Sequence, residues 1–208
     1  MFIMRSQTVA NQLRQEISRG RYQPGEKLNE VQLAERLDVS RNTLREGFAE
    51  LASQGLVTRI HHRGVFIAKP TVADVADFYT ARAFIEPNAL RTADVDVPRL
   101  STIVAAAEQA LEEGDLAKVA DANQRFHRVI VAGVGSSMVE DMMDRILALM
   151  RLAFLQVLEA EPEFHAPFVA KNREVMNALE RMNFNEAADI LEDSLISTPT
   201  AVQKYLSH

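Results

Sequence analysis

Apolar side chains recur along this chain at intervals of three and four residues, the spacing that gathers them on one face of an α-helix. Near the N-terminus Val9, Leu13 and Ile17 form one such stripe, and Gly20 ends it. A later stripe consists of Leu44, Phe48 and Leu51, and Gly55 follows it, where a left-handed C-cap is expected. The first third of the chain is therefore predicted to form three helices, over residues 8–19, 30–37 and about 40–54.

The pattern changes after Gly55 to two short runs rich in β-branched residues, 56–60 and 65–68. Such runs are typical of β-strands, and residues 61–64 between them are few enough to form a turn. This region predicts a β-hairpin with a basic tip, the arrangement called a wing.

Beyond Thr71 the helical spacing continues, and no strand is predicted. Pro162 and Pro167 interrupt the pattern, and whether Pro199 breaks the last helix is left open. Leucine and methionine over 138–150 follow a spacing that indicates core or dimer contacts rather than a cofactor site. The predicted helices cover residues 72–92, 97–113, 116–134, 138–160, 168–182 and 185 to the C-terminus.

These elements predict a mainly α fold with two domains. Residues 1–70 are interpreted as a winged helix-turn-helix, and residues 71–208 as an all-helical antiparallel bundle. A linker is expected at residues 69–71, where a proline follows the hairpin.

Composition excludes several classes of protein. The absence of cysteine excludes disulfides and thiolate sites, and it is compatible with a reducing cytoplasm, where we expect the protein. The apolar run at residues 1–4 is too short for a signal peptide. No apolar run approaches the roughly 20 residues of a membrane span, so no membrane partner is expected.

Charge is distributed unevenly between the two predicted domains. Residues 1–70 carry 11 Lys and Arg against 7 Asp and Glu, a net charge of +4, while residues 71–208 carry 12 against 22, a net charge of −10. A basic first part suits a polyanion such as DNA, although an uneven solvated surface would look the same from charge alone.

The segment 39–46 is typical of the recognition helix of a helix-turn-helix. Arg41 and Arg45 are one turn apart, so both guanidinium groups can reach phosphates or the O6/N7 edge of guanine. Ser40 is an N-cap first, and Asn42 and Thr43 are expected to point outward. The alternative is a solvated face in which nearby glutamates pair with the arginines. The candidate DNA contacts of this helix are Ser40, Arg41, Asn42, Thr43 and Arg45.

The predicted wing tip adds three more candidate contacts, His62, Arg63 and Gly64. Glycine there permits a tight turn and a close approach to the minor groove. Of the three, Arg63 is the strongest candidate because its guanidinium can bind the backbone phosphates.

The run 17–30, continued by 33–41, closely resembles the winged-helix domain of GntR-family bacterial transcription regulators. Many members have proline where Thr43 stands, a departure that should alter contacts without abolishing the fold. The remainder resembles the FCD ligand-sensing domain of the FadR subfamily, best over 123–130 and 82–86. The resemblance implies a homodimer on a short, roughly palindromic double-stranded DNA operator, with a small-molecule effector in the helical domain.

The resemblance also implies a metal site, because FCD domains commonly pair an Asp or Asn with a His four residues later and add two further histidines. Asn123 and His127 preserve the first pair, but Asn172 and Ser194 stand at the other two positions. One imidazole with neutral oxygens binds transition metals poorly, so a divalent metal is doubtful and no cofactor is certain. If a metal is bound, Asn123 and His127 hold it; His165, in an expected loop, is a weaker candidate.

A metal-free pocket for an organic ligand explains these polar residues better. Arg82 would bind a carboxylate of that ligand, and Tyr79 one turn earlier would line the same cavity. The alternative for Arg82 is a salt bridge to Glu86, and for the others an ordinary interior or surface position. The candidate effector-binding residues are Tyr79, Arg82, Asn123, His127, Asn172 and Ser194.

We therefore interpret the chain as a dimeric, ligand-responsive transcription regulator, a repressor rather than an enzyme. One alternative is a metal-assisted enzyme in the helical domain, with His127 as ligand or base and the winged helix as an interaction module. Five scattered histidines and no nucleophile beside a base argue against it. Another alternative is an architectural DNA binder, which would show little sequence preference and no effector response.

Overall fold

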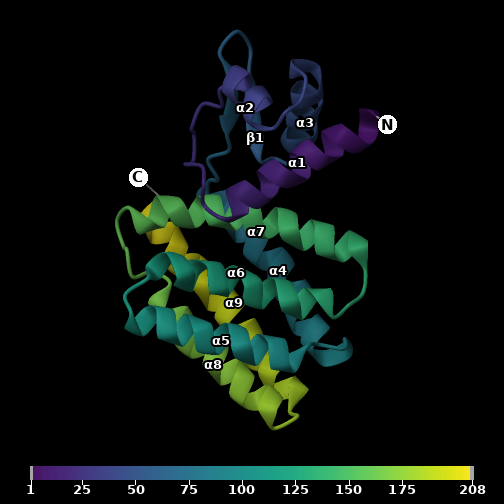
Figure 1. Ribbon diagram of the computed structural model, residues 1–208. Helices are drawn as coiled ribbons and strands as arrows, with labels where there is room; N and C mark the ends of the chain where they lie inside the picture. Colours follow the sequence, from purple (N-terminus) through teal and green to yellow (C-terminus); the bar gives the residue numbers. More distant parts are fainter. Residues whose placement is uncertain (1, 207–208) are drawn as a thin grey trace. The chain divides into compact units, whose positions relative to one another are not determined.

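The computed structural model describes residues 2–206 and shows a chain that is mainly helical (Figure 1). It divides into two compact units, one of residues 1–70 and 145–156 and the other of residues 71–144 and 157–208. None of the described helices has the length and apolar character needed to span a membrane. The elements in chain order are α1 (Phe2–Ser18), α2 (Glu30–Arg36), α3 (Arg41–Ser53), β1 (Val57–Ile60), β2 (Gly64–Ile67), α4 (Val72–Thr92), α5 (Val97–Glu112), α6 (Leu116–Ala132), α7 (Ser137–Leu158), α8 (Ala166–Glu180) and α9 (Phe184–Leu206).

The core of the first unit forms where α1 and α2 pack against α3. Leu13 and Ile17 of the predicted stripe are each 1% exposed, and Leu44 and Phe48 of α3 are fully buried. Burial of each such side chain stabilises the fold by roughly 1.5–3 kcal/mol. The three predicted helices are confirmed, although α1 begins at Phe2, earlier than its stripe indicated.

The wing is an antiparallel hairpin, as predicted, and a third segment completes it. Residues 25–28, between the first two helices, run along β2: the Leu28 N–H donates to the Val65 carbonyl over 2.9 Å, and the Ile67 N–H donates to the Glu26 carbonyl over 2.8 Å. The hairpin register pairs Val57 with Ile67, Thr58 with Phe66, Arg59 with Val65 and Ile60 with Gly64.

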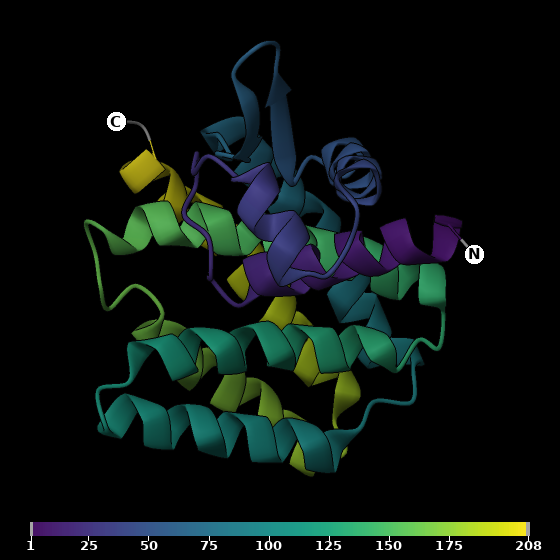
Figure 2. The ribbon, with the colours of Figure 1, turned by 45° about the horizontal axis from the view of Figure 1, so that its top comes forward.

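The second unit is all-helical, as the predicted fold class requires, but it leaves out residues 145–156 of α7, which the predicted domain of residues 71–208 included. Its α4 packs against α9 and α6, while α8 packs against α5, α6 and α9. Figure 2 shows α5 and α6 side by side, as a helical hairpin whose connection includes Gly114 with φ +73°. Side chains with at most 1% exposure that fill this unit include Leu100, Ile103, Phe126, Ile130, Met176 and Leu179.

Prolines interrupt these helices less than the sequence suggested. Pro167 lies in the first turn of α8, where its missing N–H would have no helical partner. Pro199 lies inside α9 without ending it, and Pro87 lies inside α4. Since α4 and α9 pack against each other, tertiary contacts offset the one helical hydrogen bond that each proline removes. Residues 207–208 of the last predicted helix lie outside the described part of the chain.

Candidate functional site

The third helix presents one polar face to solvent and buries the other. Its N-cap is Ser40, whose Oγ accepts the Thr43 backbone N–H over 3.1 Å, as predicted. Leu44, Phe48 and Leu51 anchor the buried face. The exposed face carries, in its first two turns, Arg41, Asn42, Arg45 and Glu46.

Thr43 does not belong to that exposed face, and the expectation that it points outward is wrong. Its side chain is 4% exposed, and its Oγ1 lies 2.9 Å from the Ser40 Oγ. The N-cap bond draws the threonine toward the start of the helix, so Thr43 supports the cap and does not contribute to the exposed face of α3.

Two side chains of the polar face are held by carboxylates. The Nε of Arg45 donates to Oε2 of Glu30 over 3.0 Å, and Nδ2 of Asn42 donates to Oε1 of Glu46 over 2.9 Å. Arg41 is exposed and has neither a hydrogen bond nor an ion pair among the residues that the structure describes. The sequence suggested that nearby glutamates, Glu46 or Glu50, pair with the arginines, but it gave no indication of Glu30, which lies on α2.

The wing tip consists of His61, His62 and Arg63, all exposed. The two imidazole rings stack with centroids 3.7 Å apart, and His62 itself adopts the left-handed backbone with φ +58°. Gly64 is not at the tip but is the first residue of β2, with φ +111°. The Arg63 guanidinium lies 6.0 Å from the ring centroid of Phe66, so its charge stays at the surface beside the hairpin.

Together, the start of α3 and the wing tip offer guanidinium, amide and imidazole donors on one unit of net positive charge. Guanidinium groups bind phosphate oxygens and the guanine edge through parallel N–H donors. This chemistry suits a nucleic-acid backbone and base edges, and it lacks the nucleophile beside a base that covalent catalysis needs.

A buried polar cluster lies in the second unit, between α4 and α6. Glu86 is fully buried, and each of its carboxylate oxygens is engaged: Oε1 accepts from Nε of Arg82 over 2.6 Å, and Oε2 lies 2.6 Å from Nδ1 of His127. The bridge between Arg82 and Glu86, weighed above as the alternative, is therefore present. Nη2 of Arg82 is buried and has no hydrogen-bond partner among the described residues.

Burial and neighbouring charges set the protonation of this cluster. Burial lowers the pKa of His127 below its ordinary 6.5 despite the opposing effect of Glu86, so the imidazole is neutral near pH 7. Burial would raise the pKa of Glu86, but Arg82 and His127 outweigh it and keep that pKa below 4.5. Because a carboxylate only accepts, Nδ1 of neutral His127 donates to Glu86, and its Nε2 keeps a lone pair.

The other expected effector residues continue from this cluster. Asn123 lies one turn before His127 on α6, and its Oδ1 accepts from Nδ2 of Asn172 on α8 over 3.0 Å. On the other side, the Tyr79 ring centroid lies 5.2 Å from the Arg82 guanidinium carbon, and burial raises the Tyr79 pKa above 10.

Ser194 of α9 completes the expected set at its edge. It is half-buried, and its carbonyl accepts from Oγ1 of Thr198 one turn later over 2.6 Å. Thr198 and Arg82 both act on the Tyr79 hydroxyl and partly offset the rise in its pKa that burial causes. Hydrogen bonds thus join α8 to α6 and α6 to α4, with Glu86 as a member that the sequence named only as a partner of Arg82. Among the described residues, the Ser194 side chain makes no bond to the other expected residues.

These residues do not fit a transition metal. His127 is the only imidazole among them, and the Oδ1 of Asn123 already accepts a hydrogen bond from Asn172. No group of three or more His, Asp or Glu side chains suited to a metal occurs within residues 2–206. His165 lies in the turn before α8, as expected, but it is 2% exposed and packs edge-on against Phe164 and Phe168.

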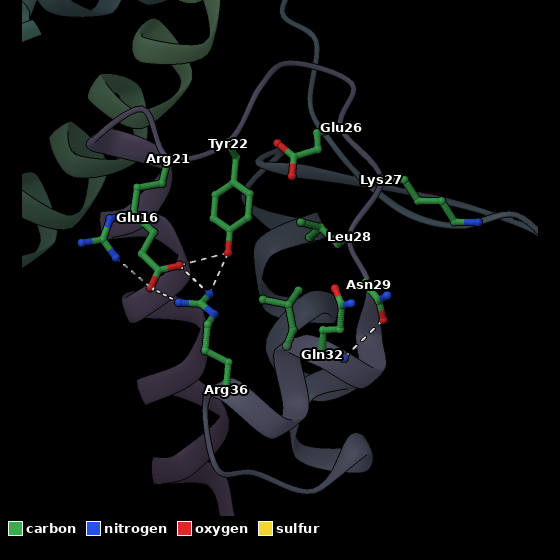
Figure 3. A pocket seen from close by; sticks show the side chains of 10 residues that line it. Glu16, Arg21, Tyr22, Glu26, Lys27, Leu28, Asn29, Gln32 and Arg36 are labelled. Carbon is green, nitrogen blue, oxygen red and sulfur yellow. Dashed lines mark hydrogen bonds and ion pairs between the residues drawn. The ribbon is translucent and has the colours of Figure 1, made fainter.

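An open pocket of about 390 Å³ lies in the first unit beside a second polar cluster (Figure 3). Glu16, 5% exposed, accepts two bonds of 2.7 Å from Arg36 and one of 3.0 Å from the Tyr22 hydroxyl. Since these groups already satisfy one another, the cluster connects α1 to α2 rather than awaiting a ligand. The sequence contained a signal for it: Glu16 is seven residues after Val9, on the apolar stripe of α1.

Two family profiles match the chain. One, described as bacterial regulatory proteins of the gntR family, matches residues 5–67, and the other, described as the FCD domain, matches residues 77–196. The first covers the helix-turn-helix and wing, and the second covers most of the helical unit.

Individual proteins are similar to this chain over about two thirds of its length or more. The HTH-type transcriptional repressor GlaR of Escherichia coli (strain K12) is 30% identical over 151 residues, which are 66% of this chain and 66% of that protein. The HTH-type transcriptional regulator YdhC of Bacillus subtilis (strain 168) is 27% identical over 86% of this chain and 81% of its own length. The crystal structure of a GntR regulator from Rhodococcus sp. RHA1 aligns with a TM-score of 0.85 and 29% identity, over 97% of this chain and 98% of that one.

Proposed function

The chain belongs to the GntR family of bacterial transcription regulators and carries the FCD domain of its FadR subfamily, and from this premise we propose that it is a homodimeric repressor whose operator affinity is set by a small organic effector. The family consists of regulators and not of enzymes, which removes the metal-assisted enzyme considered from the sequence.

The observation that carries the proposal is the exposed start of α3. Arg41, Asn42 and Arg45 project from a helix whose other face is fixed in the core, as a helix that enters a major groove requires. Arg63 on the wing is suited to the backbone or minor groove, and the net charge of +4 over residues 1–70 favours the approach of DNA. Because the proposed partner is operator DNA, we also propose that the protein acts in the cytoplasm.

Repression is supported by similarity to GlaR, whose name describes a transcriptional repressor. A homodimer is supported by large apolar side chains left exposed in the second unit, including Phe84 at 73% and Met138 at 80%. Monomeric proteins rarely expose extensive apolar surface, and a two-fold dimer would bind a palindromic operator.

The effector is proposed to bind the polar cluster of the helical unit without a metal. A carboxylate is favoured because the buried Nη2 of Arg82 has no partner in the described part of the chain. Neutral His127 adds a lone pair at Nε2, which can accept from a ligand hydroxyl. The factor by which such a ligand changes operator affinity equals the ratio of its affinities for the DNA-bound and the DNA-free protein.

DNA binding can be tested without knowing the operator. Wild-type protein would be selected against a pool of duplexes with a randomised centre, and the enriched duplex used in fluorescence anisotropy titrations. We expect two chains per duplex and a salt-dependent affinity. Arg45→Ala should weaken binding by at least about 1 kcal/mol and relax the preference at one base pair.

Arg181→Ala serves as the control, because it removes the same charge from an exposed site in the second unit. Its affinity should equal that of the wild type. Enrichment of no sequence, or equal losses in the two variants, would contradict the proposed function.

A further inference from the structure

The ion pair between Arg45 and Glu30 joins the recognition helix to a different helix. Glu30 is the first residue of α2, fifteen residues earlier in the chain, and its side chain is 28% exposed against 61% for Arg45. The bond takes the Nε donor of the guanidinium. It leaves the two terminal nitrogens, Nη1 and Nη2, directed to further partners.

We propose that Glu30 is a positioning residue: it presets the guanidinium of Arg45, which makes Arg45 the arginine that selects a base and leaves Arg41 to contact phosphate. This inference rests on the proposed function, because it requires that α3 contacts DNA. It goes beyond that function by assigning different roles to two arginines that are one turn apart on the same helix face.

The physical reason is preorganisation. A bidentate contact to O6 and N7 of guanine needs two N–H donors in one plane at a fixed position. A long arginine side chain loses rotamer freedom when it is placed there. Because Glu30 already holds Nε in the free protein, Arg45 loses less of that freedom on binding DNA.

Arg41 lacks such a constraint. It is exposed and has no hydrogen bond or ion pair within the described residues. A mobile cation can follow a phosphate over a range of positions, since that contact carries no base information. The same residue type on the same face is therefore suited to two different tasks.

The position of Glu30 is itself well determined. Asn29 caps α2, and its Oδ1 accepts from the N–H groups of Val31 over 3.1 Å and Gln32 over 3.2 Å. A carboxylate in the first turn of a helix is stabilised by the partial positive charge of the helix N-terminus. The cap thus fixes the backbone of Glu30 at the start of α2, from which its side chain reaches Arg45.

Removing Glu30 removes both its negative charge and its positioning of Arg45, and these two losses affect DNA binding differently. A carboxylate near the duplex repels phosphates, so its removal strengthens binding to every sequence. Loss of positioning instead lowers the preference for the guanine that Arg45 contacts. Measuring affinity for the selected duplex and for duplexes with that base pair replaced separates the two effects.

The experiment compares the full-length wild type with Glu30→Ala, Glu30→Gln and Glu35→Ala. Glu35 is an exposed carboxylate on the same helix whose side chain makes no bond among the described residues, so it controls for charge. The probes are the duplex enriched by the wild type, its single-base-pair variants, and a scrambled duplex, titrated by fluorescence anisotropy.

All three variants should bind the scrambled duplex more tightly, by roughly two- to threefold. Of these three variants, only Glu30→Ala should lose selectivity at one base pair, by about tenfold, equivalent to about 1.4 kcal/mol. Glu30→Gln should keep most of the selectivity, because its amide oxygen can still accept from Nε of Arg45. A fourth variant, Glu30→Asp, keeps the charge but shortens the side chain, so it should also lose selectivity. Thermal unfolding of each variant verifies that it is folded.

Wild-type selectivity in Glu30→Ala, or an equal loss in Glu35→Ala, would overturn the inference while leaving DNA binding intact. Tighter binding of Glu30→Ala to the selected duplex alone would also overturn it, since Glu30 would then compete with DNA for Arg45. If the wild type enriches no sequence, the proposed function itself fails.

Discussion

Glu86 determines what the buried cluster of the helical unit can do. Both of its oxygens are already bonded, one to Arg82 and one to His127, so the guanidinium charge is largely neutralised before any effector arrives. A carboxylate effector must therefore use the remaining buried nitrogen of Arg82 or displace Glu86 from it. This requirement favours ligands that add further hydrogen bonds, for example to the Nε2 of His127.

The lowered pKa of His127 predicts a pH dependence of stability. The unfolded chain takes up a proton at about pH 6.5, whereas the folded chain does so only at lower pH. The part of the free energy of unfolding that comes from neutral, buried His127 is therefore complete above pH 6.5. It is lost as the pH falls below 6.5, at up to about 1.4 kcal/mol per pH unit. Urea unfolding at a series of pH values between about 7 and 5.5 measures this slope.

His127→Gln is the matched variant, because its amide can donate to Glu86 but does not titrate. Its free energy of unfolding should fall less over the same interval. Glu86 itself, with a pKa below 4.5, contributes only at lower pH. Parallel slopes in the two proteins would show that His127 is not the group responsible.

At the scale of elements, the junction of α1 and α2 depends on a charged residue placed on an apolar helix face. Glu16 bonds Arg36 and Tyr22, and the bond from Arg36 is the main reason that the pKa of Glu16 falls below 4.5. Burial of the Tyr22 hydroxyl beside Glu16 raises its pKa to about 12. A helix of only seven residues, α2, is thereby tied to its neighbour by side chains as well as by packing.

Glu16→Ala should lower the free energy of unfolding by about 1.5–3 kcal/mol, because charge-assisted bonds are lost and a buried hydroxyl is left without its acceptor. Arg21→Ala removes the outermost ion pair of the same cluster, at 3.6 Å and 59% exposure, and should cost less than about 1 kcal/mol. Chemical denaturation of both variants, with hydrogen exchange of residues 30–36, measures the effect. Similar losses in the two would refute a central role for Glu16.

At the scale of the whole molecule, the chain combines a basic DNA-binding unit with an acidic helical unit that we propose binds the effector. The charge difference, +4 over residues 1–70 and −10 over residues 71–208, directs DNA to the first unit. A screen of the intact protein against small molecules tests for the proposed carboxylate effector directly.

A thermal-shift screen against small organic acids, amino acids and sugars, with EDTA, zinc or nickel in parallel, should identify a stabilising acid that acts equally in EDTA. An acid at a hundred times its dissociation constant stabilises the folded state by about 2.7 kcal/mol. Arg82→Ala should abolish the shift, and Ser194→Ala, a milder change at the edge of the site, should reduce it. Stabilisation by metal alone, abolished by His127→Ala, would contradict a metal-free site.

Local patterns along the chain are sufficient to predict the order and type of the elements and the polar start of α3. Stripe spacing, the Ser40 cap and the positive-φ turn at Gly55 depend on neighbours within about four residues, so they are visible without a structure. Pro199 shows the limit of such signals, because packing of α9 keeps its helix continuous.

The pairing of the polar residues, in contrast, depends on contacts between segments that are distant in the chain. Glu86 meets His127 across 41 positions, Asn172 meets Asn123 across 49, and Glu30 meets Arg45 across 15. The tertiary structure also turned Thr43 into the core, against the outward position expected of it. These outcomes depend on how helix faces come together in space, because a charge is placed by the burial and partners available to it rather than by its local pattern.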